Sequence, residues 1–584
     1  MIKIIKKDLK FDNANIDKLA TELNTTKEVI SLLLNRGYSE NEIKQLIETD
    51  YDILKACDSL TNCKEAATIL ADAILDDKAE IYIYADYDCD GIMSGSIAKN
   101  VLNDITKALE SKCKITVKMP NRHEGYGLSM KWCKKKFPRK TKKNIVVMTV
   151  DNGITKHEEV EYLKSKGINV IISDHHVPKE GEIPDCLIVD AWLNDKNNKN
   201  ALGLCGAAVT FLILGKLLSL LNDNEYIYNY LPYAAIATIT DVMPATPLNM
   251  SIMKIGLDMF NSEILSEPLL YYKKYVGSNL SIKDIAFGLG PQMNACGRMG
   301  DTEIATEFLC SQNEEKIEDL YSKIANINDK RKAKENAIIE GLKEIDYSND
   351  LFIIVYIPDA GGITGTLASK LVNMYNKPTI VFSGNGEILT GSARSAGELN
   401  LHEVFNYEVE KGNVLYFGGH HLAAGVTIEA DKLLILRESL NKLLLSLIVE
   451  DDNVEDKDIE IKVDDFIHLK DISTNTLNKY TKNILYFGTL KEPTFALKDV
   501  KVIDYRRSSN NPNHICLVLE DETCKAKIDR KGDIKGKEVW IWNKANEIEP
   551  ILKETNVIDI IGKIIPDFRF KKLSTLDIEK IIPA

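Results

Sequence analysis

The chain has 584 residues and a formal net charge of −13, and 44% of its residues are hydrophobic and 28% charged. This length exceeds what one hydrophobic core can organise, so we expect about three to four domains. The acidic balance argues against a protein that coats nucleic acid with uniform positive charge, although it leaves room for a local basic channel.

The cysteines and the N-terminus point to the compartment. Eleven cysteines are scattered without a CxxC pair, which disfavours a disulfide framework or a structural zinc site and is typical of reduced cytosolic thiols. Residues 1–20 lack the pattern of a signal peptide, and no run of about 18 apolar residues follows. We therefore expect a cytoplasmic protein without a membrane segment.

The apolar pattern divides the chain into segments. Residues 1–75 are predicted to form short helices, because their apolar residues recur at helical spacing. Over residues 76–312, four β-rich runs alternate with amphipathic segments; they are "EIYIYA", "NIVVMTV", "INVIIS" and "CLIVD". This alternation is typical of a parallel α/β sheet.

The second half of the chain is predicted to hold three further parts. Residues 313–345 form one long charged helix with a narrow apolar stripe, which we interpret as a connection between domains. Residues 346–448 form a second, smaller α/β domain, in which "LFIIVYI" and "PTIVFS" are strands. After an acidic run, residues 459–584 alternate like a small β-barrel. The predicted fold is therefore a multidomain α/β protein that ends in a β-barrel.

Acids and histidines follow three of the predicted strands. Asp86, Asp88 and Asp90 come after "EIYIYA", Asp151 after "NIVVMTV", and Asp174-His175-His176 after "INVIIS". In open α/β sheets the ligand crevice lies outside the carboxyl ends of the strands. Asp241, which ends "YAAIATITD", is a further candidate for the same crevice.

Metal ions would compensate the mutual repulsion of so many carboxylates. Carboxylates mixed with imidazoles suit Mn²⁺, whereas an all-oxygen site suits Mg²⁺ or Ca²⁺. Two ions about 3.5–4 Å apart could share a carboxylate and activate water against a phosphoryl centre. Each motif alone also fits a calcium loop, a turn with solvated acids or a structural histidine pair, but their shared placement favours a metal site.

The order "DYDCDG", "DNG", "SDHH" and then Asp241 resembles the DHH phosphoesterase superfamily, and more closely its RecJ family of single-strand-specific DNA exonucleases. Five longer stretches support this resemblance: "PNRHEGYGLS", "LGPQMNACGRMGD", "GSARSAG", "GGHHLAAG" and "ILYFGTLKEPTF". The third and fourth match the second domain of the superfamily, and the last resembles the segment that leads into the family's OB-fold. The resemblance covers nearly the whole chain.

The resemblance implies a nuclease that degrades single-stranded DNA from the 5′ end to mononucleotides, in DNA repair and recombination, with Mn²⁺ or Mg²⁺ and two ions in the site. It implies five direct metal ligands: Asp86, Asp88, Asp151, His175 and Asp241. It also implies that Asp90 and His176 are catalytic residues that orient these ligands or bind the phosphate.

The substrate-binding residues are also implied by the resemblance. Glycines let backbone N–H groups approach a phosphate, and arginines bind it through two hydrogen bonds. The candidates are Tyr126, Arg298, Arg394, Gly418, Gly419 and His420. For each of them a purely structural role stays open. The same choice, between contact with DNA and a solvated surface, stays open for the lysine-rich run 134–143 and for Tyr505, Arg506 and Arg507.

The chain also departs from the family. It has Asp190-Ala191 where the family carries Asn-Pro, Asn249-Met250 where Asn-Arg is usual, and no tryptophan-histidine pair in "YIPDAGGITG". None of these departures removes a metal ligand, so we expect activity with an altered substrate preference or processivity. The partners expected for the family are single-stranded DNA, a helicase and a single-strand-binding protein, and a monomer is the default.

Two other functions remain open. The first is a phosphodiesterase of the same superfamily that acts on short oligonucleotides or cyclic dinucleotides; the extra N-terminal helices and the C-terminal barrel argue against it. The second is a non-enzymatic replication scaffold that has lost its metal ions. Every acidic position of the motifs is filled in this chain, which argues against such a loss.

Overall fold

The structure of the protein is a computed structural model, and its described residues fall into two compact units. The described residues are 2–6, 13–48, 52–120, 125–178, 183–193, 203–262, 265–277, 280–397, 399–451, 459–528, 534–542, 544–567 and 574–584. Unit 1 comprises Met1–Tyr51, Pro244–Lys254 and Asp456–Ala584, and unit 2 comprises Asp52–Met243 and Ile255–Glu455.

Unit 2 contains the predicted parallel sheet, with strand order β3-β2-β4-β5-β6. The strands are β2 (Glu80–Ala85), β3 (Lys114–Lys118), β4 (Ile145–Val150), β5 (Asn169–Asp174) and β6 (Leu187–Asp190). All neighbouring pairs are parallel. The central strands are continuous apolar runs because helices cover both faces of a parallel sheet, so the carboxyl ends of β2, β4 and β5 open at one edge.

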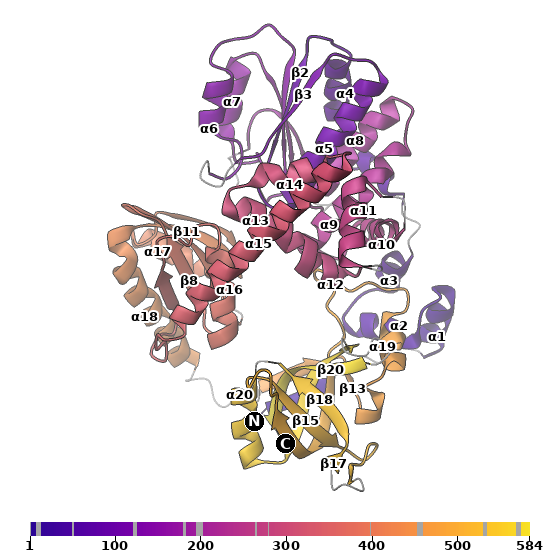
Figure 1. Ribbon diagram of the computed structural model, residues 1–584, viewed down its shortest axis with the longest axis vertical. Coiled ribbons are helices and arrows are strands. Elements are labelled where there is room, and N and C mark those ends of the chain that lie inside the picture. Colours follow the sequence, from indigo (N-terminus) through magenta and orange to yellow (C-terminus); the bar gives the residue numbers. More distant parts are fainter. Residues whose placement is uncertain are drawn as a thin grey trace. The chain divides into compact units, whose positions relative to one another are not determined.

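Helices of two groups cover this sheet (Figure 1). On one side lie α6 (Met130–Lys136) and α7 (His157–Ser165). On the other lie α4 (Cys63–Ile74), α5 (Cys89–Ala108) and α8 (Gly206–Leu220). Helix α8 is apolar on nearly every side because it packs against α4, α5 and α9 (Leu231–Thr240). It thereby brings its N-terminus to the edge where the strands end.

Further helices extend this part of unit 2 towards the long connecting helix. They are η3 (Tyr226–Tyr230), α11 (Glu267–Val276), α12 (Ile282–Asp284), η4 (Ile285–Leu289), α13 (Gly290–Met299) and α14 (Thr302–Leu309). Helix α10 (Pro247–Asn261) is divided, with residues up to Lys254 in unit 1 and the rest in unit 2. Helix α15 (Glu314–Leu342) contacts α11, α13 and α14 at one end and α16 (Thr364–Tyr375) at the other. The predicted connecting helix is therefore present, and its bounds differ from the prediction by a few residues.

Helix α15 leads to the second α/β domain, whose sheet has the order β10-β11-β9-β8-β7. Its strands are β7 (Ile353–Tyr356), β8 (Thr379–Ser383), β9 (Ile388–Arg394), β10 (Tyr416–His420) and β11 (Ala423–Glu429). Only β7 and β8 are parallel. Besides α16, this domain contains α17 (Leu401–Glu410), η5 (Ala430–Lys432) and α18 (Leu433–Asp451).

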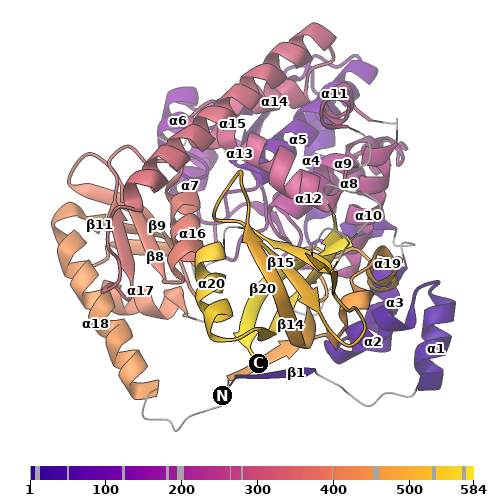
Figure 2. The same ribbon diagram turned by 60° about the horizontal axis from the view of Figure 1, so that its bottom comes forward.

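Unit 1 combines the N-terminal helices with the C-terminal strands (Figure 2). Its helices are α1 (Asn13–Glu22), α2 (Lys27–Asn35), α3 (Glu40–Ile47), η6 (Leu469–Asp471), α19 (Thr474–Thr481) and α20 (Ala545–Glu554), and η1 (Ile53–Asp58) begins unit 2. Its main strands are β13 (Asp465–Phe466), β14 (Phe495–Arg507), β15 (Ile515–Glu520), β18 (Lys537–Ile541), β19 (Val557–Pro566) and β20 (Ser574–Pro583). They form one sheet of order β18-β15-β14-β19-β20, with β13 beside β14.

Two features of unit 1 differ from the sequence prediction. The expected β-barrel is an antiparallel sheet whose edge strands β18 and β20 are not hydrogen-bonded to each other, so the described strands do not close a barrel. In addition, β1 (Ile2–Lys6) lies in a region predicted to be helical and pairs in parallel with β12 (Ile459–Val463). A short hairpin pairs β16 (Lys527–Ile528) with β17 (Ile534–Lys535).

Among the helices of the described residues, none is both long and apolar enough to span a membrane.

Candidate metal centre and substrate groove

The acids of the first motif lie between strand β2 and helix α5. Asp86 follows the last residue of β2, and Asp88 caps α5 by accepting a hydrogen bond from the Gly91 backbone N–H at 3.1 Å. Carboxylates are favourable at this position because a helix N-terminus presents unpaired N–H groups and a partial positive charge. Gly91 is required here, since a Cβ atom would lie 2.5 Å from the Asp86 carbonyl oxygen.

The seven side chains predicted to be catalytic lie together at the carboxyl edge of the sheet. Nε2 of His175 lies 3.1 Å from Oδ1 of Asp151, 3.6 Å from Oδ2 of Asp90 and 3.7 Å from Oδ2 of Asp241. Three overlapping groups have ligand atoms within 4.8 Å of one another: Asp86, Asp88 and Asp151; Asp90, His175 and Asp241; and Asp151, His175 and His176. Because Asp151 and His175 each occur in two groups, the arrangement offers shared ligands to more than one ion.

Asp90 is anchored by the N-terminus of α8. Its two carboxylate oxygens accept the backbone N–H groups of Gly206 and Ala207 at 2.6 and 2.7 Å. Gly206 also faces Asp151, because a Cβ atom there would lie 2.6 Å from the Asp151 Cβ atom. The N-terminus of α8, a position suited to binding an anion, therefore binds a protein carboxylate. This contact sets the position of Asp90 in the cluster.

Burying so many carboxylates without a positive charge beside them costs folding free energy. The pKa values of Asp86, Asp151 and Asp241 lie well above the usual range, because burial removes water from each carboxylate and the neighbouring acids repel its charge. Oδ1 of Asp86 and Oδ1 of Asp151 are buried and accept no hydrogen bond from the described residues, although Oδ1 of Asp151 lies 3.1 Å from Nε2 of His175. Unpartnered buried oxygens in a mixed carboxylate–imidazole set fit a divalent cation such as Mn²⁺ or Mg²⁺.

The two histidines differ in charge. Burial lowers the pKa of His175, which keeps its imidazole neutral and able to bind a metal ion. For His176, burial acts against ionisation, but Nδ1 lies 2.7 Å from Oδ1 of Asp174 and this contact raises the pKa of His176 to about 9. At neutral pH His176 is therefore a cation beside the acids.

Asp174 holds both histidines and was missing from the predicted site. Oδ1 also accepts the backbone N–H groups of His175 and His176 at 2.8 and 3.3 Å, and Oδ2 accepts that of Ile154 at 2.9 Å. Burial opposes the charge of Asp174, but the His176 contact and the N–H donors hold its pKa below the usual range. The sequence motif itself, Asp-His-His, was the signal for this role.

Asn152 and Asp190 are further buried polar residues at this edge. The Asn152 amide donates to the carbonyl groups of Tyr84 and Val150 and accepts the Leu128 N–H at 3.1 Å, so it ties β2 and β4 to the segment that precedes α6. Asp190 ends β6 opposite Asp174 in the strand register. Burial and the Asp174 charge raise the pKa of Asp190 to about 8.

Among the predicted substrate residues, Tyr126 adjoins the acid cluster. Its hydroxyl lies 3.1 Å from Nε2 of His176, and its ring packs edge-on against the imidazole at 5.7 Å. The side chain is 41% exposed, so one side of the ring stays open to a ligand. Residues 121–124, which precede it in the "PNRHEGYGLS" motif, lie outside the described residues.

Away from the acid cluster, a hollow of about 700 Å³ lies in unit 2 between the end of α13, helix α15 and the sheet of the second α/β domain. Arg298 lines it and donates from Nη1 to the Gly362 carbonyl oxygen at 3.1 Å. Gly362 has φ +85°, and a Cβ atom there would lie 2.2 Å from the Arg298 carbonyl oxygen. This close approach is possible only for glycine. The loop is the "YIPDAGGITG" segment that departs from the family.

The other predicted substrate residues come from the second sheet. Arg394 ends β9 and is mostly buried, and its pKa is lowered by burial. In the register, Ala423 of β11 pairs with Arg394 on one side and with His420 of the edge strand β10 on the other. Gly418 and Gly419 are exposed on β10, and the side chain of His420 lies outside the described part of the chain.

Three of the basic residues left open by the sequence form ion pairs with acidic side chains. Lys143 forms an ion pair with Glu80 at 2.9 Å, although most lysines of the run 134–143 are exposed. In unit 1, Arg507 binds Glu549 with two hydrogen bonds, and Arg506 binds Glu538 at 2.9 Å. Two tryptophans that the sequence reasoning missed, Trp540 and Trp542, stack beside them with ring centroids 5.9 Å apart.

Comparison with known proteins agrees with this geometry. Residues 80–238 match the DHH family, N-terminal domain, and residues 352–470 match the DHHA1 domain. The chain is 28% identical over 540 residues to the single-stranded-DNA-specific exonuclease RecJ of Bacillus subtilis, covering 90% of this chain and 65% of that protein. It is 27% identical to RecJ of Haemophilus influenzae, covering 84% of this chain and 87% of that protein.

A solved structure has the same fold. The structure of RecJ from Thermus thermophilus in complex with Mn²⁺ superposes with a TM-score of 0.77 at 20% sequence identity, over 99% of this chain and 79% of that one. The sequence matches, the domain matches and this superposition lead to one conclusion. The chain is similar to the RecJ exonucleases over most of its length, and it contains one region that matches the DHH family, N-terminal domain, followed by one that matches the DHHA1 domain.

Proposed function

We propose that the protein is a metal-dependent exonuclease that hydrolyses single-stranded DNA from the 5′ end to mononucleotides. The observation that carries this proposal is the cluster of five buried or half-buried acids and two histidines at one sheet edge, with unpartnered carboxylate oxygens inside it. The RecJ relatives, named as single-stranded-DNA-specific exonucleases, supply the substrate class.

The residues of the cluster would have two roles, binding of the metal ions and positioning of the residues that bind them. Asp86, Asp88, Asp151, His175 and Asp241 would hold two Mn²⁺ or Mg²⁺ ions, and the neutral imidazole of His175 suits that task. When bound, such ions neutralise phosphate charge and lower the pKa of water. Asp90, held by α8, would keep the arrangement in place, because both of its oxygens already accept backbone N–H groups.

His176 would bind the scissile phosphate rather than a metal ion. Its contact with Asp174 raises its pKa to about 9, so the imidazole carries a positive charge at neutral pH. Its Nε2 would donate a hydrogen bond to a phosphate oxygen in place of the Tyr126 hydroxyl, which lies 3.1 Å away. Tyr126 lies against the same ring, where its half-exposed face is positioned to stack on the terminal base.

The hollow of about 700 Å³ would receive the DNA backbone. It is lined by Arg298, Lys334, one acid (Asp359), hydroxyl groups and several glycines, a combination that offers a net positive charge and backbone N–H groups to phosphates. Backbone contacts carry no sequence information, so hydrolysis would be largely independent of sequence. Arg394 and the Gly418-Gly419-His420 end of strand β10 would extend this grip, as predicted from the motifs.

Unit 1 would add a second contact with single-stranded DNA. Trp542 is 38% exposed and stacks on Trp540, while Arg506 lies 5.9 Å from the Trp540 ring. Aromatic rings with adjacent cations are the usual platform for unpaired bases. We place this activity in the cytoplasm, with a helicase and a single-strand-binding protein as partners of a monomer.

The test compares long single-stranded DNA, labelled at its 5′ or its 3′ end, with duplex DNA and a dinucleotide, in the presence of Mn²⁺. We expect early release of the 5′-labelled mononucleotide, weak cleavage of duplex, and loss of activity in Asp151→Asn. Activity on the dinucleotide alone would move the protein to the small-nucleotide phosphodiesterases. Bound metal without hydrolysis of any of these substrates would favour the scaffold.

A further inference from the structure

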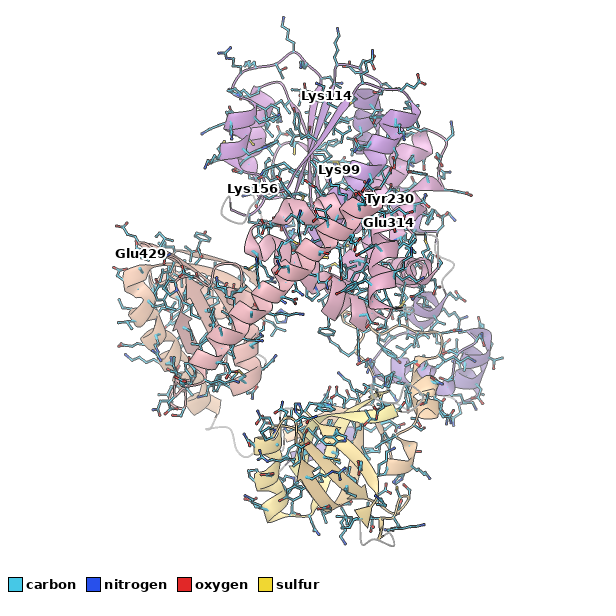
Figure 3. All side chains as sticks on the ribbon, in the orientation of Figure 1. Lys99, Lys114, Lys156, Tyr230, Glu314 and Glu429 are labelled. Carbon is cyan, nitrogen blue, oxygen red and sulfur yellow. The ribbon has the colours of Figure 1, made fainter. Side chains whose placement is uncertain are left out.

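Unit 2 has two adjoining hollows on its helical side, away from the acid cluster. The larger, of about 550 Å³, is lined by Asp104 of α5, Tyr226 and Tyr230 of η3, and Ser266 and Glu267 at the start of α11. The smaller, of about 270 Å³, is lined by Glu267, Tyr271, Lys274, Tyr275, Glu314 and Ile317. Glu267 lines both hollows. Figure 3 labels Tyr230 and Glu314, one from each.

The Asp104 carboxylate in the larger hollow is held by two hydrogen bonds. Its Oδ2 accepts hydrogen bonds from the hydroxyl groups of Tyr226 at 2.6 Å and Tyr230 at 3.0 Å. Burial and this contact raise the pKa of Tyr226 to about 12, so the hydroxyl keeps its proton and stays a donor. The two tyrosines thus fix the carboxylate in one orientation, with Oδ1 left for another donor.

The charges around the hollows are mostly negative. Asp104, Glu267 and Glu314 line them, and none of the three forms an ion pair with a residue in the described part of the chain. Lys274 is the one lysine among the lining residues described, and it lies in the smaller hollow. The walls also carry tyrosine rings, of which Tyr275 is 64% exposed. Carboxylates combined with aromatic faces attract organic cations.

Other ligand classes fit these hollows less well. Nucleic acid would bring phosphates against three carboxylates. A divalent cation prefers several converging carboxylate or carbonyl oxygens. The larger hollow has two lining carboxylates, Asp104 and Glu267, and Glu267 also lines the smaller hollow. The groups bonded to Asp104 are tyrosine hydroxyl groups that keep their protons. Among the described residues, the groups able to hold a metal ion do not include any of these side chains.

We propose that these two hollows form a docking site for a basic segment of a partner protein, which inserts a lysine or arginine side chain into each hollow. The larger hollow would hold its cation between Asp104 and the tyrosine rings, and the smaller between Glu267 and Glu314. An extended segment suits this arrangement, because residues of α11 line both hollows and Glu267 belongs to each.

The docking site is separate from the proposed catalytic cluster. Asp90 and Asp104 belong to the same helix, and 14 residues of α-helix span about 21 Å. Substitutions in the hollows should therefore leave hydrolysis of single-stranded DNA unchanged. Failure of the docking site and failure of the proposed exonuclease activity can be told apart in this way.

The test measures binding of a fluorescent nine-residue peptide, with Arg at positions 3 and 7 and Gly or Ser elsewhere, by anisotropy with the Mn²⁺-loaded full chain. We expect Asp104→Asn and Glu267→Gln each to weaken binding about three- to tenfold, as for a partly buried charge pair. Lys274→Gln should strengthen binding, because it removes a competing cation. Opposite effects of substitutions in one site would not arise from misfolding.

Three controls decide the result. Glu158→Gln, an exposed acid at the start of α7, should leave binding unchanged, and a peptide with Gln in place of Arg should not bind. An equal loss in Glu158→Gln would reduce the effect to the net charge of the chain and overturn the proposal. Absence of peptide binding to the wild type, or binding of spermidine in the hollows but not of the peptide, would also overturn it.

Discussion

Nε2 of His175 lies 3.1 Å from Oδ1 of Asp151, although the two residues follow different strands. The parallel register pairs Val150 of β4 with Ser173 of β5, so the chain leaves both strands at the same level of the sheet. Asp151 then takes a left-handed backbone conformation, with φ +62°, which aspartate adopts more readily than most residues. This turn directs the carboxylate back towards the imidazole.

Asp151→Asn should make the metal-free protein more stable while it abolishes hydrolysis. Burial and four neighbouring acids raise the pKa of Asp151, so keeping this carboxyl in place costs free energy at neutral pH, and the amide removes that cost. We expect the free energy of unfolding to rise by about 1–3 kcal/mol. Thermal unfolding in EDTA measures the change.

The control for this substitution is Asp185→Asn. Asp185 is almost fully exposed and pairs with Lys164, and such a surface pair contributes little. Its removal should leave both stability and activity nearly unchanged. If the metal-free Asp151→Asn protein were less stable than the wild type, the claim that repulsion among these acids destabilises the metal-free protein would be wrong.

Stabilisation by Mn²⁺ should increase as the pH rises. The pKa values of Asp86, Asp151 and Asp241 are raised in the folded metal-free protein, so the folded state binds more protons than the unfolded state. Its stability therefore falls as the pH rises through this range, and metal binding must displace those protons. The measurement is the difference in Tm with Mn²⁺ and with EDTA, from about pH 5 to about pH 8.

The outcome for a matched variant separates this effect from general acid denaturation. In Asp86→Asn combined with Asp151→Asn, the Tm difference should be small at every pH, because two of the groups that exchange protons for metal are absent. A pH-dependent Tm difference of wild-type size in this variant would contradict the assignment.

The sequence predicted the parallel sheet and its acidic edge because both follow from local pattern. The runs that became β2, β4, β5 and β6 are short and apolar, and acids or histidines follow β2, β4 and β5 directly. Parallel strands place their carboxyl ends together whatever the rest of the chain does. The long helix α15 was equally readable from its length and its charged surface.

Other features could not be predicted, because they depend on contacts between residues far apart in the sequence. Strand β1 exists through pairing with β12, more than 450 residues later, and its own five residues carry no decisive pattern. The anchoring of Asp90 by Gly206 depends on where α8 begins in space. Likewise, the engagement of Arg507 with Glu549 is invisible to motif reasoning, which had left this arginine open for DNA.

His176→Gln should raise KM for single-stranded DNA and remove its alkaline dependence. Asp174 raises the pKa of His176 to about 9, so the contribution of this charge is complete below the unperturbed value and is lost as the pH rises through about 9. Wild-type KM should therefore rise at alkaline pH. The variant should have a high KM that is constant, which steady-state kinetics from about pH 7 to about pH 10 would show.

A surface histidine supplies the comparison. His402→Gln changes an exposed imidazole of α17 and should keep the wild-type pH profile. If His176→Gln lowered kcat and left KM unchanged at neutral pH, a role in phosphate binding would be ruled out.

Trp542→Ala should weaken binding of single-stranded DNA without changing hydrolysis of a dinucleotide. The exposed indole stacks on Trp540 and can extend that stack to a base, and loss of one base–aromatic contact costs about 1–3 kcal/mol. Fluorescence titration with an oligonucleotide gives the affinity. Tyr407→Ala, at an exposed position on α17, is the comparison, and an equal loss there would argue against a specific role of the tryptophan.

Gly206→Ala should destabilise the protein and reduce hydrolysis, although alanine is normally preferred in a helix. A Cβ atom at this position would lie 2.6 Å from the Asp151 Cβ atom and 2.7 Å from its Oδ1, so either α8 or Asp151 must move. Movement of α8 would loosen its hold on Asp90, and movement of Asp151 would displace a proposed metal ligand. We expect a loss of about 1–3 kcal/mol in the free energy of unfolding and weaker Mn²⁺ binding by isothermal titration.

Gly341→Ala is the matched control, because it makes the same chemical change in α15, where a Cβ atom would meet no atom within 4 Å. Alanine should there stabilise the protein by about 0.5–1 kcal/mol, since glycine loses more backbone entropy in a helix. The two substitutions are thus expected to have opposite signs. If Gly206→Ala were also stabilising and kept its Mn²⁺ affinity, the close packing of α8 against Asp151 would not be needed for the metal centre.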